Sequence, residues 1–413
     1  TPDSNSFYEW DDEASTGLGY SAGQSTRVLY EVNGEFNDWC YGETVLKPRL
    51  FSWTPEMGSQ NDGFWPPPSR ILPLANEGLR PCYTVAAIAG PYVRMERAEW
   101  TGAALLIGNL GNVEVFARNI GRASTATGLN ARLVSLDPGA EVLSGPLGYP
   151  TLACRTSGAP NGHATFLVGT VDTLTPGRLL RFRVEFRDDA GLYCRDTVEV
   201  PAGLPTVLIN DPSTNFTNWL IGGNWGTVSN NAQHPSRFFA DSPFGVYVTS
   251  YNGAFTLKGR MNLSAGLHAY ACFDARWSFE GDFDACMVEA SLDSVIWTPL
   301  SGRATTNGLF SPQPAGKPCY EGQRYNWRAE RVDLSPFCGP AATAVRFRFH
   351  SVSDAGTEFD GFNFDSLRIQ FFDPAAQPAP VAVAPHAGLD FEFEAPAPNP
   401  ARGAGLKSAG VIE

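Results

Sequence analysis

Strict alternation of apolar and polar residues marks the middle of the chain. Leu180-Arg-Phe-Arg-Val-Glu-Phe186 alternates at every position, which is typical of a strand with one buried and one solvent-facing side. Turn-forming residues such as Asp137-Pro-Gly139 separate further short runs of this kind. These runs cover residues 113–119, 131–135, 165–169 and 197–200. About seven strands in about 110 residues predict an immunoglobulin-like β-sandwich for residues 93–203.

A second set of strand-like runs follows in residues 204–372, which we predict to be a larger β domain. The runs cover residues 245–249, 254–257, 268–273, 285–291, 295–298, 328–333, 345–351 and 364–372. Residues 373–413 then lose this periodicity. Their Pro- and Ala-rich opening, Pro374 to Pro385, is typical of an extended, semi-rigid linker.

Residues 1–92 have a different pattern and are predicted to be a partial α/β domain. Ser69–Gly90 has apolar residues at helical spacing, and we expect a helix that is interrupted at Pro81 and ends at Gly90. Leu50–Trp53 is a short apolar run that predicts a buried strand. The polar, Gly-rich stretch Thr1–Gln24 predicts a long loop over an active-site face.

Composition narrows the class of protein. A chain of 413 residues is too long for one core, so several domains are expected. Its 43% hydrophobic content indicates a globular protein, and its 42 Gly and 32 Pro favour β structure with many turns. The formal net charge of −13 argues against nucleic acid as a partner. No run of about eighteen apolar residues exists, so no membrane-spanning helix is predicted.

The stretch Tyr30–Pro68 carries the candidate chemistry. Glu56 follows the predicted strand and precedes a loop rich in Gly and Pro. A carboxylate in that place is where an α/β enzyme holds a general base. Each residue also has a structural explanation: a lone Glu after a strand is usually a solvated carboxylate, Tyr30 could simply pack, and Asn37 could be a turn residue.

The same stretch resembles the zinc carboxypeptidases of the funnelin (M14) type. Tyr30 precedes Asp38-Trp39 by eight residues, and residues 63–79, GFWPPPSRILPLANEGL, resemble that family's Gly-Phe-x-x-Pro loop and closing helix. The resemblance covers roughly residues 1–92. It implies that Glu56 is the general base and acid and that Tyr30 caps the bound C-terminal residue. It also implies that Asn37 lies at the floor of the specificity pocket, with Phe64 on its wall.

The chain departs from that family in its metal ligands. The family's zinc is held by a His-x-x-Glu pair and a distant His, all before the stretch in question. Here every His follows Glu56, and none has Glu three residues later: His163, His234, His268, His350 and His386. The resemblance therefore implies the C-terminal part of a precursor that removes C-terminal residues from peptides. Its zinc ligands would lie outside this chain, which alone would be inactive, and the missing N-terminal part would be a partner.

Residues 204–372 resemble the jelly-roll modules of the MAM and immune-inhibitor-A type. The motifs are Asp241-Ser-Pro-Phe-Gly245, residues 289–300 and Asp360-Gly-Phe-Asn-Phe-Asp365. Such modules often hold a structural Ca²⁺, which prefers several carboxylate and carbonyl oxygens. The candidate ligands are Asp241, Asp274, Asp282, Asp284, Asp360 and Asp365. The alternative is that these are acidic turn residues that cap strands. Pro398-Asn-Pro400 resembles the opening of a type IX secretion sorting domain.

Eight cysteines without a Cys-x-x-Cys motif favour disulfides and an oxidising, extracellular compartment, secreted or at the cell surface. The predicted pairs are Cys40–Cys82, Cys154–Cys194, Cys272–Cys286 and Cys319–Cys338. Eight buried free thiols are the alternative. A second functional hypothesis makes the two β domains a surface-displayed binding, adhesion or assembly module beside an inert peptidase remnant. Aromatic residues could also form a sugar-binding platform, although core positions are more common for them: Trp219, Trp225, Trp277, Trp297 and Trp327.

Overall fold

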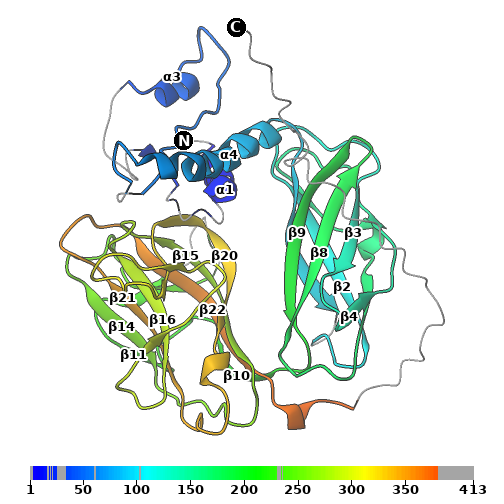
Figure 1. The fold of residues 1–413 in the computed structure, drawn as a ribbon, viewed down its shortest axis with the longest axis vertical. Helices are drawn as coiled ribbons and strands as arrows, with labels where there is room; N and C mark the ends of the chain where they lie inside the picture. The colour runs from blue at the N-terminus through cyan, green and yellow to red at the C-terminus, as the bar shows by residue number, and fades with distance from the viewer. Residues whose placement is uncertain are drawn as a thin grey trace. The chain divides into compact units, whose positions relative to one another are not determined.

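Two β-sandwiches follow a helical N-terminal segment (Figure 1). The computed structural model describes residues 3–15, 18, 20, 22–25, 34–59, 62–101, 104–229, 234 and 236–379. The chain divides into two compact units, residues 1–381 and 382–413, and all the described residues belong to the first. The prediction of a mainly β protein is confirmed. No helix in the described ranges has both the length and the apolar character that a membrane crossing requires.

Among its described residues, the N-terminal segment contains the helices α1 (Ser4–Ser15), α3 (Phe36–Gly42) and α4 (Pro68–Ala89). The predicted helix over Ser69–Gly90 is confirmed as α4, which continues through Pro81 rather than breaking there. It ends where the Gly90 amide donates to the Ala87 carbonyl. The prediction of a long loop over Thr1–Gln24 was wrong for α1. That helix forms because Phe7 and Trp10, three residues apart, present one aromatic face to Phe51 and Trp53.

The prediction of a buried strand at Leu50–Trp53 was also wrong. These residues have no regular secondary structure, and no strand precedes β1 among the described residues of this segment. The Phe51 ring lies 5.0 Å from the Trp10 ring and 5.2 Å from the Phe7 ring, centroid to centroid. The run is therefore apolar because it packs against α1, with no sheet neighbour.

The first sandwich has a five-stranded and a four-stranded sheet, and its first strand begins at Val93. One sheet has the order β1-β2-β7-β4, with β6 paired to β2, and the other has the order β5-β3-β8-β9. Every strand pair is antiparallel. The strands are β1 (Val93–Thr101), β2 (Leu110–Asn119), β3 (Asn130–Ser135), β4 (Ala140–Val142), β5 (Leu147–Gly148), β6 (Ser157–Gly158), β7 (Phe166–Thr170), β8 (Leu179–Asp188) and β9 (Gly191–Pro201).

The second sandwich has a six-stranded and a five-stranded sheet and a small two-stranded one. The orders are β12-β13-β22-β15-β20 with β10 paired to β22, β11-β14-β21-β16-β17, and β18-β19. The strands before β17 are β10 (Thr206–Asp211), β11 (Trp219–Ile221), β12 (Gly226–Val228), β13 (Phe238–Ala240), β14 (Asn252–Leu257), β15 (Ala269–Ser278) and β16 (Ala285–Ser291). The others are β17 (Thr298–Pro299), β18 (Thr306–Asn307), β19 (Pro318–Cys319), β20 (Gln323–Asp333), β21 (Arg346–Val352) and β22 (Gly361–Phe371). Short 3-10 turns lie at Asn161–His163, Ser335–Phe337 and Pro374–Ala376.

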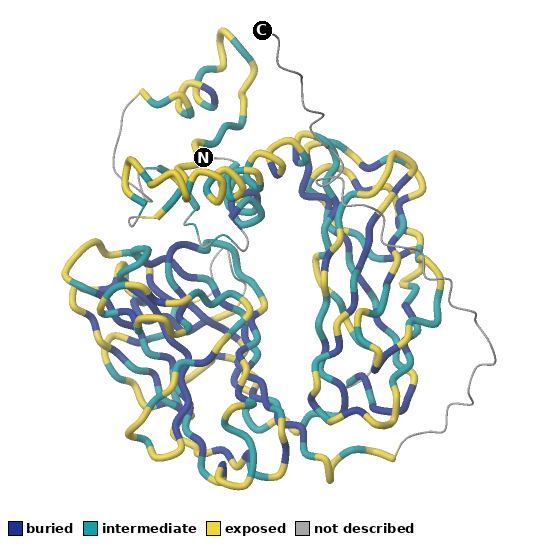
Figure 2. The backbone as a smooth tube through the Cα atoms, viewed as in Figure 1, coloured by how far each residue is buried: buried dark blue, intermediate teal, exposed yellow. Residues whose placement is uncertain are grey.

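Each sandwich has its own hydrophobic core (Figure 2). In β8 the alternation read from the sequence is confirmed, because Leu180, Phe182, Val184 and Phe186 are all fully buried. In the second sandwich Trp219 stacks on Phe255 at 4.2 Å between ring centroids. Trp219, Trp225 and Trp277 are core residues, so they cannot form an exposed sugar-binding platform. The domain boundaries, and the immunoglobulin-like and jelly-roll types, remain predictions.

None of the four predicted disulfides is present, because all eight cysteines are free in the structure. Cys272 lies in β15 and Cys286 in β16, strands that belong to different sheets of the second sandwich. Cys40 is buried in α3, whereas Cys82 is exposed on α4.

Candidate functional site

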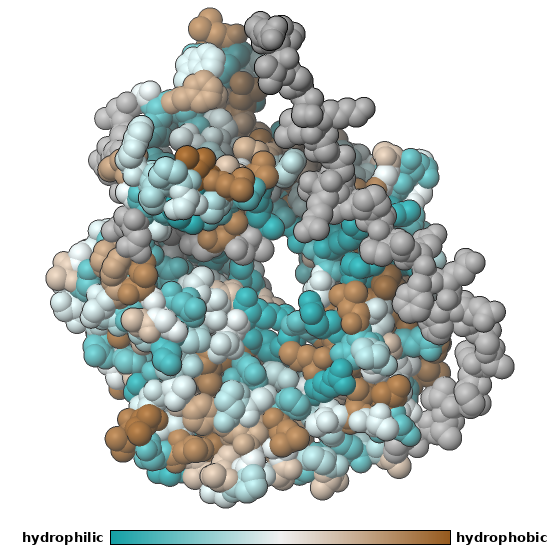
Figure 3. Space-filling view, viewed as in Figure 1, coloured by the Kyte–Doolittle hydropathy of each residue, from teal (hydrophilic) through white to brown (hydrophobic). Residues whose placement is uncertain are grey.

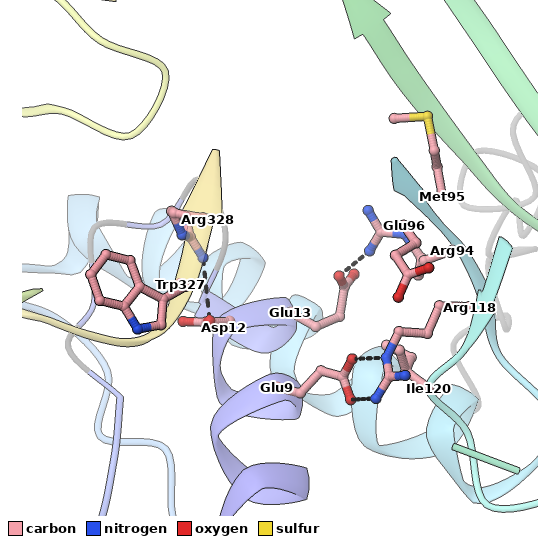
Figure 4. Close-up of a pocket in the computed structure, with 10 residues that line it drawn as sticks. All are labelled: Glu9, Asp12, Glu13, Arg94, Met95, Glu96, Arg118, Ile120, Trp327 and Arg328. Atoms are coloured by element: carbon pink, nitrogen blue, oxygen red, sulfur yellow. Dashed lines mark hydrogen bonds and ion pairs between the residues drawn. The ribbon is translucent and has the colours of Figure 1, made fainter. Parts of the chain in front are cut away.

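The acidic face of α1 lies against arginines from both sandwiches (Figure 4). Glu9, Asp12 and Glu13 share one side of the helix because they are three and four residues apart. We call these three carboxylates and their arginine partners the acid–arginine clamp. The partners on the sandwiches are Arg94, Arg118 and Arg155 from the first and Arg324 and Arg328 from the second, and Arg80 of α4 also pairs with Glu13.

On the first sandwich, several close ion pairs make up the clamp. Arg118 Nε donates to Glu9 Oε1 at 2.5 Å, and Arg155 forms a second ion pair with Glu9. Arg94 pairs with Glu13 and also donates from Nε to Asp196 Oδ1 at 2.9 Å. Because guanidinium groups hold carboxylates in a fixed planar geometry, these contacts orient α1 as well as attract it.

On the second sandwich the clamp is centred on Asp12. Asn326 Nδ2 donates to Asp12 Oδ2 at 2.9 Å, and an Arg328 terminal nitrogen lies 3.3 Å from the same oxygen. The ring of Tyr8 lies 4.6 Å from that of Tyr325, centroid to centroid. Both sandwiches therefore contact the same helix.

A cavity of about 330 Å³ lies at this junction. It is lined by the clamp residues Glu9, Asp12, Glu13, Arg94, Arg118 and Arg328, together with Met95, Glu96, Ile120 and Trp327 (Figure 4). Its wall carries both signs of charge, and most of its carboxylates are already paired with arginines. We interpret it as part of a docking interface, since it offers no free pair of acid and base for catalysis.

An apolar cluster lies next to the clamp and includes a residue of the same helix, Trp10. Trp10, Ile88 and Ile120 are buried together, and Trp10 Nε1 donates to the Ile120 carbonyl at 2.7 Å. Asp11 is buried beside them and accepts from Trp53 Nε1 at 2.7 Å. Burial raises the pKa of Asp11 to about 7, since the charged form has lost most of its water.

Of the residues predicted for catalysis and specificity, the structure describes Glu56, Phe64 and Asn37. Glu56 is exposed in an irregular stretch after Trp53, and Phe64 is fully exposed. Asn37 is half-buried in α3 and donates to Thr54 Oγ1 at 2.8 Å, while its own Oδ1 is buried without a partner. Tyr30 lies outside the described residues. The fold thus places Asn37 close to the stretch that carries Glu56, but it does not bury Phe64 in a pocket wall.

The described histidines do not supply a zinc site near Glu56. His163 contacts Glu114 in the first sandwich, and His234 lies 3.7 Å from Asp365 in the second. His268 and His350 contact Ser335 and Glu289, and His386 lies outside the described residues. Within the described ranges, none of these histidines joins a group of metal-ligating side chains. The residues present therefore do not fit a zinc site.

Three carboxylates in the second sandwich do form such a group. Glu280, Asp284 and Asp354 each place an oxygen within 4.8 Å of the others. Asp284 is buried and accepts from Tyr247 Oη at 2.6 Å and from the Asp354 amide at 2.8 Å. Burial raises the pKa of Asp284 to about 6. Sequence analysis missed Glu280 and Asp354, although the acid-rich turn 280–284 signals the first of them.

The other predicted calcium ligands occupy separate environments. Asp241 is completely buried and accepts from the Phe362 amide at 3.0 Å, and burial raises its pKa to about 7. Asp274 and Asp365 face each other across β15 and β22. The remaining two have protein partners: Asp360 pairs with Arg276 at 3.4 Å, and the Asp282 amide donates to Glu321 at 2.8 Å. Only Asp284 of the six belongs to the three-carboxylate group.

Comparison with known proteins links the N-terminal segment to a family. The family model for zinc carboxypeptidase, Peptidase_M14, matches residues 5–80, which include nearly all of α1, all of α3, Glu56 and most of α4. The chain is also similar to the secreted serine protease VesC from Vibrio cholerae, with 13% identity over 69% of this chain and a TM-score of 0.22. It spans about half, 51%, of that protein's length. SGBP-B from a xyloglucan utilization locus in Bacteroides uniformis is 12% identical over 68% of this chain and 73% of that one, with a TM-score of 0.27. Such low scores carry no argument about activity.

Proposed function

We propose that this chain is the C-terminal portion of a secreted zinc metallocarboxypeptidase that removes C-terminal residues from peptides. The observation that carries the proposal is the zinc-carboxypeptidase family match over residues 5–80. The five histidines all lie after residue 80, so the zinc ligands would come from polypeptide outside this chain. The chain on its own would then be inactive, and its substrates would be peptides or proteins.

Within that enzyme, Glu56 is the proton-transfer group contributed by this chain. Its carboxylate would take a proton from the attacking water and return it to the leaving amine. Its position in an exposed stretch leaves it accessible to a polypeptide that completes the site. Tyr30, Asn37 and Phe64 would contact the terminal residue of the substrate, as the family resemblance implies.

Purification of the protein from its natural source, followed by metal analysis and a carboxypeptidase assay, tests the proposal. We expect zinc in the isolated complex, and a loss of about 10²–10⁴-fold in kcat on Glu56→Gln. Glu99→Gln is the matched control, because Glu99 lies on the exposed face of β1 in the first sandwich. A complex without zinc, or a Glu56→Gln variant of full activity, would refute the proposal.

We further propose a structural Ca²⁺ in the second sandwich, held by Glu280, Asp284 and Asp354. The support is the convergence of three carboxylates, since Ca²⁺ prefers several oxygen ligands in flexible loops. Asp241, Asp274, Asp282, Asp360 and Asp365 remain candidates from the family resemblance. Calcium titration followed by thermal unfolding is the test.

The alternative function is a surface-displayed binding, adhesion or assembly module in which the peptidase segment is inert. Exposed apolar residues on a loop of the second sandwich favour it: Phe244, Val246 and Val248 alternate along the chain and all are exposed. Partners would be cell-surface components. Zinc-free material of the mass expected for this chain alone would support this alternative.

A further inference from the structure

The outer face of one sheet in the first sandwich is rich in arginine. In β8 the four apolar residues at alternate positions of Leu180–Phe186 are buried, so the residues between them lie on the opposite face. The register of β3 and β9 on β8 places alternate residues of those strands on the same outer face. The arginines of this face are Arg132, Arg181, Arg183, Arg187 and Arg195. We call these five residues the arginine ladder.

Arg132 has no carboxylate partner because the nearest one is already shared by two other arginines. In the pairing of β3 with β8, Arg132 lies directly opposite Glu185. The Glu185 Oε1 atom, however, lies 2.8 Å from Arg183 Nε and accepts from Arg195 Nε at 3.1 Å. Among the residues that the structure describes, no acidic side chain pairs with Arg132, which is exposed.

The rest of the ladder is also short of negative charge. Glu199 lies 3.7 Å from Arg181 but is shared with Arg331 of the second sandwich, at 2.5 Å. Arg187 is exposed close to the β8–β9 turn, and no acidic side chain in the described ranges pairs with it. Asp189, in that turn, accepts a hydrogen bond from a threonine side chain instead. Five arginines and two glutamates give this outer face a formal charge of +3, in a chain whose net charge is −13.

The excess charge recurs along the strands. Residues two positions apart on one face of a strand are separated by about 6.8 Å. The three successive cross-strand rows that contain Arg183, Glu185 and Arg187 of β8 each have one more arginine than carboxylate. Guanidinium groups hold carboxylates and other oxyanions through two parallel hydrogen bonds. The arginine ladder therefore matches an extended polymer that carries anionic groups at regular intervals.

The composition of this face favours a polysaccharide over a nucleic acid. Proteins that bind single-stranded nucleic acids stack aromatic side chains on the bases, and the outward positions of β3, β8 and β9 hold none. Tyr193 of β9 packs against the core of the sandwich. A flat sheet face also cannot enter a duplex groove as a helix or a two-stranded ribbon does. Figure 3 shows strongly hydrophilic side chains on the first sandwich in the region where Figure 1 draws β8 and β9.

We propose that the arginine ladder binds a linear acidic polysaccharide that carries carboxylate or sulfate groups. The polymer would lie along β8, with its anionic groups on Arg132 and Arg187, the two arginines that have no acidic partner of their own. The inference goes beyond the carboxypeptidase proposal and is independent of it, since no residue of the ladder lies in the matched residues 5–80. For the alternative function it names the chemistry of the cell-surface partner.

Titration of the full 413-residue chain with defined polymers tests the inference. We expect binding to sodium polygalacturonate, to heparin or to both, and none to neutral dextran. Binding should weaken as salt is added, because ions screen exposed charges. Tighter binding of polygalacturonate identifies carboxylate as the recognised group, and tighter binding of heparin identifies sulfate. The inference is overturned if neither acidic polymer binds, or if single-stranded DNA at the same charge concentration binds more tightly than both.

A charge-matched pair of variants locates the binding surface. Arg132→Gln/Arg187→Gln should weaken binding of the acidic polymer at least about tenfold, since hydrogen bonds between charged groups are lost. Arg237→Gln/Arg260→Gln removes the same charge from exposed positions of the second sandwich and should bind as the parent does. An equal loss in both variants would show that net charge governs binding and would overturn the inference.

Two further measurements keep the result separate from folding and from catalysis. Arg132 and Arg187 are exposed, so the unfolding temperature of their double variant should equal that of the parent. Zinc content and peptidase activity of material from the natural source should also be unchanged in this variant. Loss of polymer binding with zinc and activity intact would support the ladder, whereas a protein without zinc that still binds the polymer would refute only the peptidase proposal.

Discussion

The indole N–H of Trp10 donates to the main-chain oxygen of Ile120 at 2.7 Å, across 110 residues of sequence. Trp10 is 1% exposed, and its ring lies 5.0 Å from that of Phe51, centroid to centroid. The bond joins the helical segment to the residue that follows β2. The N-terminal segment and the two sandwiches belong to the same compact unit.

Replacement of Trp10 should therefore detach α1. Trp10→Ala removes a buried aromatic side chain and its hydrogen bond, and we expect a loss of about 3–5 kcal/mol in the free energy that holds the segment in place. Limited proteolysis should show rapid cleavage within residues 3–89, with the sandwiches intact. Trp65→Ala is the control, since Trp65 is 95% exposed. Equal protection of the Trp10→Ala variant and the parent would contradict the structure.

The clamp should be sensitive to salt. Glu13 pairs with Arg94 and Arg80 and accepts from Tyr92 Oη, so Glu13→Gln weakens three contacts at once. We expect a loss of about 1–2 kcal/mol, between the values for exposed and for buried pairs. Proteolytic release of α1 should rise with salt in the parent and depend less on salt in the variant. An identical salt dependence for both proteins would show that the clamp contributes nothing to docking.

The β-sandwiches could be predicted from the sequence far better than the N-terminal segment. Period-two alternation, as at Leu180–Phe186, follows directly from the geometry of a strand with one buried face. Phe51 and Trp53 give no such signal, because a four-residue, mainly apolar run fits a strand or a packed loop equally well. Their partners Phe7 and Trp10 lie more than forty residues earlier, and no local pattern reveals that contact.

Prediction of the candidate sites was limited for the same reason, since no local pattern reveals contacts between residues far apart in the sequence. Acidic residues with metal-binding potential were recognised in the second sandwich, but only Asp284 joined a group. Asp354 reaches that group through the pairing of β16 with β21, which brings the ends of distant strands together, whereas Glu280 lies in the same loop as Asp284, whose amide donates to the Glu280 carbonyl. The arginines of the clamp are spread over residues 94–328, so the acidic run 9–13 could be seen in the sequence but its partners could not.

Asp11 should make the packing of the N-terminal segment against the sandwiches depend on pH. Its pKa is about 7 in the folded protein and about 3.8 in an unfolded chain, so the folded state binds the proton more tightly. Stability is then highest below about pH 4 for this group and falls as the pH rises towards 7. Asp11→Asn keeps an oxygen that can accept from Trp53 and removes the charge. We expect it to stabilise the segment at pH 8 by up to a few kcal/mol, at about 1.4 kcal/mol per pKa unit, and to change little at pH 4.

Urea unfolding of Asp11→Asn at several pH values measures this effect. Asp12 and Arg324 also act on Asp11, with opposite signs, so Asp12→Asn is a useful comparison. A stabilisation by Asp11→Asn that is the same at pH 4 and pH 8 would show that another group causes the pH dependence.

Substitution of Asp284 distinguishes a calcium site from an acidic turn that binds no metal. Without a metal, Asp284 is a carboxylate with a pKa raised to about 6 by burial, and Asp284→Asn should be neutral or stabilising at pH 8 because it removes a desolvated charge. With Ca²⁺ bound by Glu280, Asp284 and Asp354, the same variant should be destabilising and should abolish the response to calcium. Free Ca²⁺ at a hundred times its dissociation constant would stabilise the parent by about 2.7 kcal/mol.

Thermal unfolding with calcium or a chelator therefore gives opposite signs for the two cases. Asp172→Asn, an exposed change in the first sandwich, should leave both responses unaltered. If calcium raises the unfolding temperature of Asp284→Asn as much as that of the parent, the ion binds elsewhere.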